Sequence, residues 1–274
     1  MRFLPWFVVC AAARARIPNI VLILADDLGW GEAETTADVI SPHGRIATPH
    51  LARIFGDGGL VFDAAYSGYS VCGPSRTALM SGRNAGHLYS GGSTPNLPTL
   101  LRNAGYATGC FGKSDPYEQP TSAGFDYFLG QDSQAKCHDM YPVELDAQRM
   151  GDGTFAVPLP QNNRTNVSRA SCMAAPDDFA YTSDVFEAEA LAWIANRSSE
   201  GAARPFFAYL AYTTPHAGDW GANGETGNPV PSDLQYADQS SWPDVERDHV
   251  RSLRAPARPV SPALKISRPP RPPP

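Results

Sequence analysis

The stretch Asn19-Ile20-Val21-Leu22-Ile23-Leu24-Ala25-Asp26-Asp27 is a continuous apolar run that ends in two adjacent carboxylates. Unbroken runs of Ile, Val and Leu are typical of a strand buried on both faces of a sheet, and we predict such a strand over 19–25. Two neighbouring carboxylates at the end of a buried strand are costly unless a cation or hydrogen-bond donors stand opposite. Ligands of α/β sheets bind at the carboxyl ends of the strands, which makes Asp26 and Asp27 candidate ligand-binding residues. The alternative is a strand end that merely enters solvent.

A second stretch, Val71-Cys72-Gly73-Pro74-Ser75-Arg76-Thr77-Ala78-Leu79-Met80-Ser81-Gly82-Arg83, predicts a short helix with Cys72 just ahead of it. Pro74 suits a first helical position, and Gly82 can end the helix. Unpaired backbone N–H groups, the helix dipole and Arg76 all favour an anion beside residue 72. The alternative is a small buried cysteine in a helix cap.

Further elements follow from capping residues and periodicity. We predict helices that begin after Thr48, over 96–103 and over 182–196. Short or buried strands are predicted over 60–62, over 106–111 before Lys113, and over 205–212 before His216. Residues 143–178 contain many Pro, Asn and Gly without periodicity, which predicts a long excursion over the sheet.

The string Cys72-Gly73-Pro74-Ser75-Arg76 resembles the Cys-x-Pro-Ser-Arg signature of the sulfatases, a branch of the alkaline phosphatase-like superfamily. Other stretches match the same family in its order and at similar spacing. They are Pro18–Gly31, Thr48–Leu51, Gly105–Thr108 with Gly112-Lys113, Pro205–Phe207, and Thr214–His216. The resemblance covers roughly residues 17–250 and implies an α/β fold in which helices flank a mixed, mostly parallel central sheet.

The resemblance also implies a set of catalytic groups. In the family the cysteine is oxidised by a formylglycine-generating enzyme to formylglycine, whose hydrated aldehyde is the nucleophile, so Cys72 is the expected precursor. Asp26, Asp27 and the converted residue 72 are expected to hold Ca²⁺.

Three further site residues are expected from the same resemblance. Arg76 would steady the hydrate, and Lys113 and His216 would contact the sulfate group. An imidazole that titrates near neutral pH suits assistance to a leaving group, which fits the role expected for His216.

Two places depart from the common sulfatase pattern. Lys113 is followed by Ser114-Asp115-Pro116-Tyr117, where many sulfatases have Trp-His-Leu-Gly, so the second histidine of that element is missing. The segment Cys137-His138-Asp139-Met140-Tyr141-Pro142 resembles a subgroup with a His-x-Tyr-Tyr-Pro-like segment. His138 is therefore a candidate site residue, with an ordinary loop histidine as the alternative.

The two ends of the chain have distinct compositions. Residues 1–15 resemble a secretory signal, which predicts a secreted or lysosome-like protein, and the alternative is an apolar N-terminal extension. Residues 17–250 are expected to form the N-terminal part of a sulfatase domain. Residues 251–274 hold eight Pro, six Arg or Lys and no acidic residue, which predicts a disordered tail. The sulfatase resemblance implies that the fold is C-terminally incomplete.

Cysteines and sequons add expectations about the secretory pathway. Cys137 and Cys172 flank a polar segment and are predicted to form a disulfide, with Cys110 left unpaired in an apolar strand. Glycosylation sequons begin at Asn163, Asn166 and Asn196.

The sequence therefore favours hydrolysis of a small-molecule or glycan sulfate ester. The alternatives are a phosphatase or phosphonate monoester hydrolase of the same superfamily, and an inactive homologue that binds sulfated ligands. Outside 251–274 the chain carries 16 basic and 28 acidic residues, which disfavours nucleic acid as a partner. No stretch after residue 15 is apolar for long enough to span a bilayer.

Overall fold

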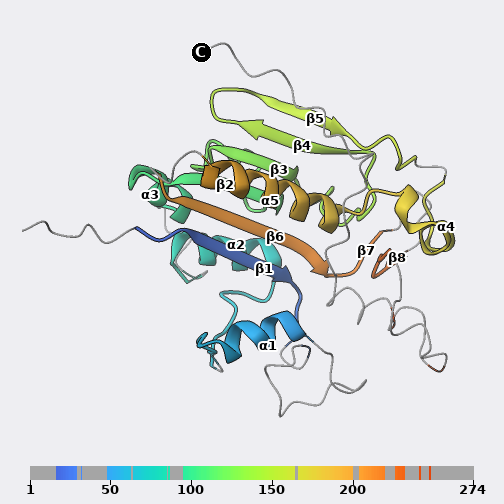
Figure 1. Ribbon diagram of the computed structural model, residues 1–274, viewed down its shortest axis with the longest axis horizontal. Coiled ribbons are helices and arrows are strands. Elements are labelled where there is room, and N and C mark those ends of the chain that lie inside the picture. Colours follow the sequence, from blue (N-terminus) through green and yellow to red (C-terminus); the bar gives the residue numbers. More distant parts are fainter. Residues whose placement is uncertain are drawn as a thin grey trace, which may run out of the picture.

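The computed structural model describes residues 17–29, 32, 48–62, 64–84, 86, 95–163, 166–199, 204–219, 226–231, 241 and 247. The predicted secretory signal and the Pro/Arg-rich tail lie outside these residues. Figure 1 shows one large sheet with helices on its two faces.

The sheet has six strands in the order β1-β6-β2-β3-β4-β5. The pairs β1/β6, β6/β2 and β2/β3 are parallel, whereas β3/β4 and β4/β5 are antiparallel. The strands are β1 (Ile20–Asp26), β2 (Ala107–Lys113), β3 (Tyr127–Gln131), β4 (Glu144–Arg149), β5 (Thr154–Pro158) and β6 (Phe206–Pro215). This mixed, mostly parallel sheet confirms the predicted α/β class.

The described helices are α1 (Pro49–Gly56), α2 (Cys72–Ser81), α3 (Leu97–Asn103), α4 (Arg169–Ala174) and α5 (Thr182–Ser199), with a 3₁₀ turn at Pro176–Asp178. Local sequence explains their ends. The Asn96 side chain accepts a hydrogen bond from Thr99 N at the start of α3, and Gly82 takes the left-handed conformation (φ 66°) that ends α2. Two short strands, β7 (Gly218–Asp219) and β8 (Thr226–Gly227), pair beside the carboxyl end of β6.

Two apolar layers hold the helices on the sheet. Strand β6 alternates between them, since Phe206, Ala208 and Leu210 face α5 whereas Phe207, Tyr209 and Ala211 face α2 and α3. Phe186 and Trp193 of α5 complete the first layer. Because helices cover both faces, the central strands β2 and β6 are buried throughout most of their length, as expected for a parallel sheet.

Strand β1 differs from the sequence prediction. It lies at the edge of the sheet, and its Val21 and Ile23 side chains are 49% and 62% exposed, so burial on both faces was wrong. Ile20, Leu22 and Leu24 do pack against the α2/α3 layer. Helix α5 contacts β2, β3 and β6, and the face of β1 that carries Val21 and Ile23 therefore stays exposed.

Two other predictions about local structure were wrong. Residues 60–62 form no strand, and their side chains are exposed. The predicted excursion over 143–178 contains β4, β5 and α4. Leu145 and Ala147 of β4 pack in the α5 layer, so these residues extend the sheet instead of crossing it.

Candidate active site

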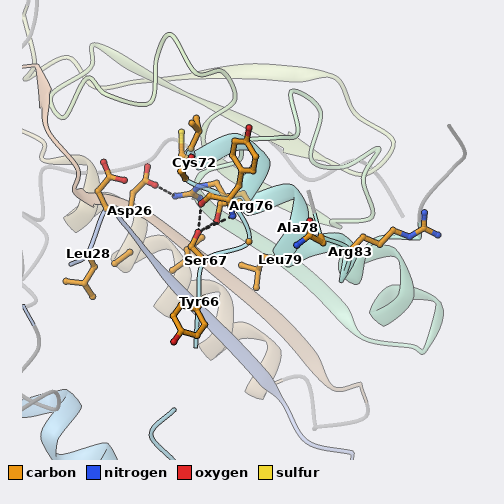
Figure 2. Close-up of a pocket in the computed structure, with 18 residues that line it drawn as sticks. Asp26, Leu28, Tyr66, Ser67, Cys72, Arg76, Ala78, Leu79 and Arg83 are labelled. Carbon is orange, nitrogen blue, oxygen red and sulfur yellow. Dashed lines mark hydrogen bonds and ion pairs between the residues drawn. The ribbon is translucent and has the colours of Figure 1, made fainter. Parts of the chain in front are cut away.

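The carboxyl ends of three strands bring the predicted charged residues together. Asp26 ends β1, Lys113 ends β2, and His216 directly follows β6. Because β1, β6 and β2 are parallel neighbours, their carboxyl ends lie side by side at the same end of the sheet. Helix α2 reaches this end and contributes Arg76 (Figure 2).

Asp26 is the centre of a buried charge cluster. Lys113 Nζ donates to Asp26 Oδ2 at 2.8 Å, and Arg76 Nη2 lies 3.3 Å from Asp26 Oδ1. The exposed fractions are 5% for Asp26, 2% for Arg76 and 0% for Lys113. Burial would raise the pKa of Asp26, but Arg76 and Lys113 outweigh burial and lower that pKa below its ordinary value.

Both cations are held in their charged forms. Burial works against the charge of Lys113, yet its contact with Asp26 keeps the lysine pKa above its ordinary value. The pKa of Arg76 is also raised, because Tyr209 and Asp26 outweigh the cost of burial. Arg76 Nη1 donates to Lys113 O and to Tyr209 Oη, both at 3.2 Å, which anchors the guanidinium to β2 and β6.

Cys72 is the first residue of α2, so the helix begins two residues before Pro74, the first helical position that the sequence suggested. It is half-buried, and it lines a pocket of about 800 Å³ together with Asp26, Asp27 and Arg76. Gln134 Nε2 donates to Cys72 Sγ at 3.1 Å. Residue 72 therefore lies at a helix N-terminus, in one pocket with the buried guanidinium of Arg76.

Two histidines stack beside the charge cluster. The rings of His138 and His216 are parallel within 9°, with centroids 4.2 Å apart, and His216 Nε2 lies 3.4 Å from Asp27 Oδ2. Burial and the neighbouring His216 and Lys113 lower the pKa of His138. Its Nε2 atom is buried and makes no hydrogen bond within the part of the chain that the structure describes. His138, expected from the sequence as a site candidate, thus lies against His216.

Asp115 stands at the sequence position where the common pattern described above has its second histidine. Its Oδ2 atom lies close to Gly73 at the start of α2, and it has no hydrogen-bond partner among the described residues. Burial raises the pKa of this carboxyl, although Lys113 and Arg76 act in the opposite direction. The site therefore has a carboxyl group near residue 72 that the sequence did not predict as functional.

The predicted disulfide between Cys137 and Cys172 was wrong, because both residues remain thiols. Cys137 Sγ donates to Gln134 O at 3.3 Å, beside the charge cluster. Cys172 instead packs with Tyr141 and Val167 in a separate apolar cluster. Cys110 is a buried thiol in β2, as predicted.

The fold resembles that of solved sulfatases. The sulfatase PsFucS1 from Pseudoalteromonas sp. superposes with a TM-score of 0.57 over 86% of this chain and 49% of that chain, at 23% identity. A family profile described as Sulfatase matches residues 18–253. The chain belongs to the sulfatase family.

Curated relatives agree with this assignment. Mouse N-acetylgalactosamine-6-sulfatase is 30% identical over 239 residues, which cover 76% of this chain and 41% of the relative. Human arylsulfatase G is 28% identical over 248 residues, covering 77% of this chain and 43% of the relative. The chain thus spans about two fifths of the length of these relatives. Within the described residues, no helix is long and apolar enough to cross a membrane.

Proposed function

We propose that this chain carries the nucleophile half of a sulfate ester hydrolase, with Cys72 converted to formylglycine. The observation that carries the proposal is the position of Cys72 at the N-terminus of α2, in one pocket with Asp26 and Arg76. Membership of the sulfatase family supports the reaction class. The hydrated aldehyde of formylglycine would supply the nucleophilic hydroxyl.

The residues of the charge cluster have separate roles in this proposal. Arg76 and Lys113 are buried, permanently charged donors that would bind the anionic sulfate group and stabilise charge that develops on it. In the structure Asp26 pairs with both of them, and its single negative charge leaves the three groups with a net charge of +1. Of these two cations Arg76 lines the pocket, where a bound anion would share it with Asp26.

The histidine pair would act on the leaving oxygen. His216 lies at the mouth of the cluster beside Asp27, where its imidazolium can give a proton to the departing alcohol. His138 stacks on His216 and would hold the ring of that residue in place. The lowered pKa of His138 favours its neutral form at pH 7.

A calcium ion fits the described residues only in part. Asp26 and Asp27 would hold it, and it would polarise a sulfate oxygen as a Lewis acid. Calcium takes about six to eight oxygen ligands, and both oxygens of Asp26 already face Arg76 or Lys113. Further oxygen ligands would have to come from outside this cluster. The roles proposed for Arg76, Lys113 and His216 do not depend on the ion.

The proposed substrate is an aryl sulfate or a sugar sulfate. A pocket of about 800 Å³ is large enough for a monosaccharide or an aryl ring. The name of the mouse relative, N-acetylgalactosamine-6-sulfatase, favours a sugar sulfate. We also propose that the protein enters the secretory pathway and meets a formylglycine-generating enzyme there.

Sulfate release from an aryl sulfate tests the reaction. The full chain, co-expressed with a formylglycine-generating enzyme, is expected to release sulfate, and Cys72→Ala is expected to release none. An aryl phosphate turned over faster than the aryl sulfate would instead indicate a phosphatase. Binding of a sulfated sugar without sulfate release would indicate an inactive binding protein.

A further inference from the structure

Gln134 contacts the reactive position although no sequence motif contains it. Its Nε2 atom donates to Cys72 Sγ at 3.1 Å, across 62 residues of sequence. Gln134 lies in the turn that follows β3, and Cys137 N and Lys136 N both donate to Ser133 O in that turn at 3.1 Å. The Gln134 amide thus approaches residue 72 from the turn after β3, whereas the cysteine itself lies on helix α2.

The neighbouring cysteine orients the amide of Gln134. Cys137 Sγ lies 3.7 Å from Gln134 Oε1 and donates to Gln134 O at 3.3 Å. The single thiol proton reaches only one of these two oxygens at a time, and when it lies on Oε1 it favours the amide orientation that points Nε2 toward residue 72. Cys137 is fully buried, so the orienting group is itself fixed by packing.

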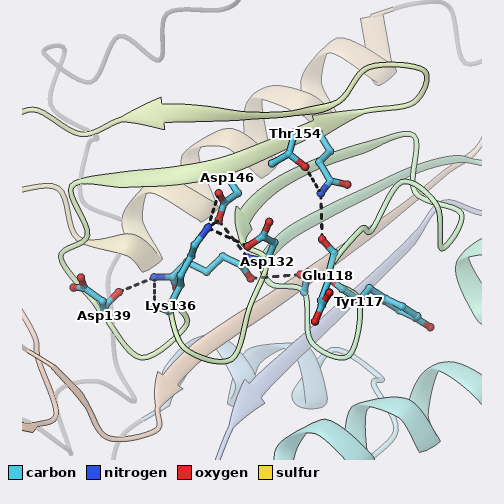
Figure 3. A network of polar contacts seen from close by, with 10 residues as sticks. Tyr117, Glu118, Asp132, Lys136, Asp139, Asp146 and Thr154 are labelled. Atoms are coloured by element: carbon cyan, nitrogen blue, oxygen red, sulfur yellow. Dashed lines mark hydrogen bonds and ion pairs between the residues drawn. The ribbon is translucent and has the colours of Figure 1, made fainter.

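The turn that carries Gln134 is anchored to the sheet. Lys136 Nζ lies between Asp132 Oδ1, at 3.2 Å, and Asp146 Oδ2 of β4, at 2.8 Å, as Figure 3 shows. The side chain of Gln131, at the end of β3, donates to Lys136 O at 2.7 Å and to Asp139 O at 2.8 Å. These bonds close the turn at both ends, and the exposed side chain of Gln134 extends from this turn to residue 72.

We propose that Gln134 is a positioning residue of this site, whose amide donates a hydrogen bond to the side chain of residue 72 and holds it in its reactive conformation. The inference rests on the proposed function, since residue 72 reacts only if that function is correct. With formylglycine at position 72, the same donor would bind an oxygen of the side chain in place of sulfur. A fixed donor there also stabilises negative charge on the reacting atom.

The unconverted thiol gives a test that needs no enzymatic activity. The full chain is produced without a formylglycine-generating enzyme, and iodoacetamide alkylation is followed on the peptide that contains residue 72. Because the Gln134 amide holds the sulfur of residue 72 in one conformation, its loss in Gln134→Leu should slow alkylation about threefold. Gln134→Glu, which replaces the donor by a carboxylate, should slow it further.

Two control variants isolate the hydrogen bond. Gln119→Leu changes an exposed glutamine outside the site and should leave the alkylation rate unchanged. Cys137→Ser keeps a donor beside the Gln134 amide and should remain near the wild-type rate, whereas Cys137→Ala should move toward Gln134→Leu. Equal alkylation rates for Gln134→Leu and the wild type would overturn the contact.

The converted protein separates this inference from the proposed function. At equal aldehyde content, Gln134→Leu should lower kcat about tenfold and leave KM nearly unchanged, as expected when a donor acts on the reacting group. An unchanged kcat would overturn the positioning role. If the wild type releases no sulfate, the proposed function fails, and the alkylation rates still decide whether Gln134 holds residue 72.

Discussion

Replacing Asp26 by Asn removes the carboxylate that pairs with both Arg76 and Lys113, without opening a cavity. Both cations are at most 2% exposed, so neither can recover its lost partner from water. Breaking a buried ion pair by removing one partner costs about 3–5 kcal/mol, and we expect about 3 because the amide oxygen still accepts one hydrogen bond. With an m value of about 2 kcal/mol/M, the urea midpoint should fall by roughly 1.5 M.

The assay is equilibrium urea unfolding of the full chain, followed by circular dichroism at pH 7 in EDTA. Asp57→Asn, at an exposed position after α1, is the control and should change stability by less than about 0.5 kcal/mol. A midpoint for Asp26→Asn that matches the Asp57→Asn midpoint would refute the buried charge cluster.

The effect of Asp26→Asn on stability should also depend on pH, in a direction set by the lowered pKa of Asp26. The pKa of Asp26 is lower in the folded chain than its unfolded value of about 4. Its stabilising contribution is therefore present above about pH 4 and is lost as the pH falls through the folded pKa. The difference between wild type and Asp26→Asn should be full at pH 7 and should shrink in acid, and a difference that grows in acid would contradict the lowered pKa.

Three further changes test packing and burial elsewhere in the fold. Gly130→Ala should destabilise the chain by about 3 kcal/mol in thermal unfolding, because a Cβ there would lie 1.9 Å from the backbone oxygen of Gly112 in the neighbouring strand. Gly153→Ala is the control. A Cβ at residue 153 meets nothing within 4 Å, so this change should be nearly neutral. Asn162→Ala should cost about 2–3 kcal/mol in urea unfolding, since this buried amide makes three hydrogen bonds of 2.7–2.8 Å to backbone groups. Glu187→Gln should stabilise the chain at pH 7 and have little effect at pH 4, because burial raises the pKa of Glu187 and its stability contribution is lost as the pH rises; equal effects at the two pH values would contradict the raised pKa.

Long apolar runs and clear caps made much of the fold predictable. The run at 19–25 forms β1, the run at 205–212 forms β6, and the helix over 182–196 appears as α5. Strands β4 and β5 escaped prediction because polar residues of β4 are buried as well. Asp146 binds Lys136, and Gln148 accepts from Thr121, so alternation of apolar and polar residues does not mark an inner and an outer face.

The site was predictable where residues belong to a sequence pattern. Asp26, Arg76, Lys113 and His216 were expected from strand ends and from the family resemblance, and the structure brings them to one edge of the sheet. Gln134 carries no such signal. Its place beside Cys72 depends on how the turn after β3 packs, and local sequence does not determine that packing.

The most direct test of the central claim relates sulfate release to the chemical state of residue 72. Co-expression with increasing amounts of formylglycine-generating enzyme should raise the aldehyde fraction at residue 72, measured by mass spectrometry of its peptide. We predict that the rate of sulfate release from an aryl sulfate rises in proportion to that fraction and is zero at zero conversion. Full conversion without sulfate release, or release that does not depend on the aldehyde fraction, would contradict the proposed role of Cys72.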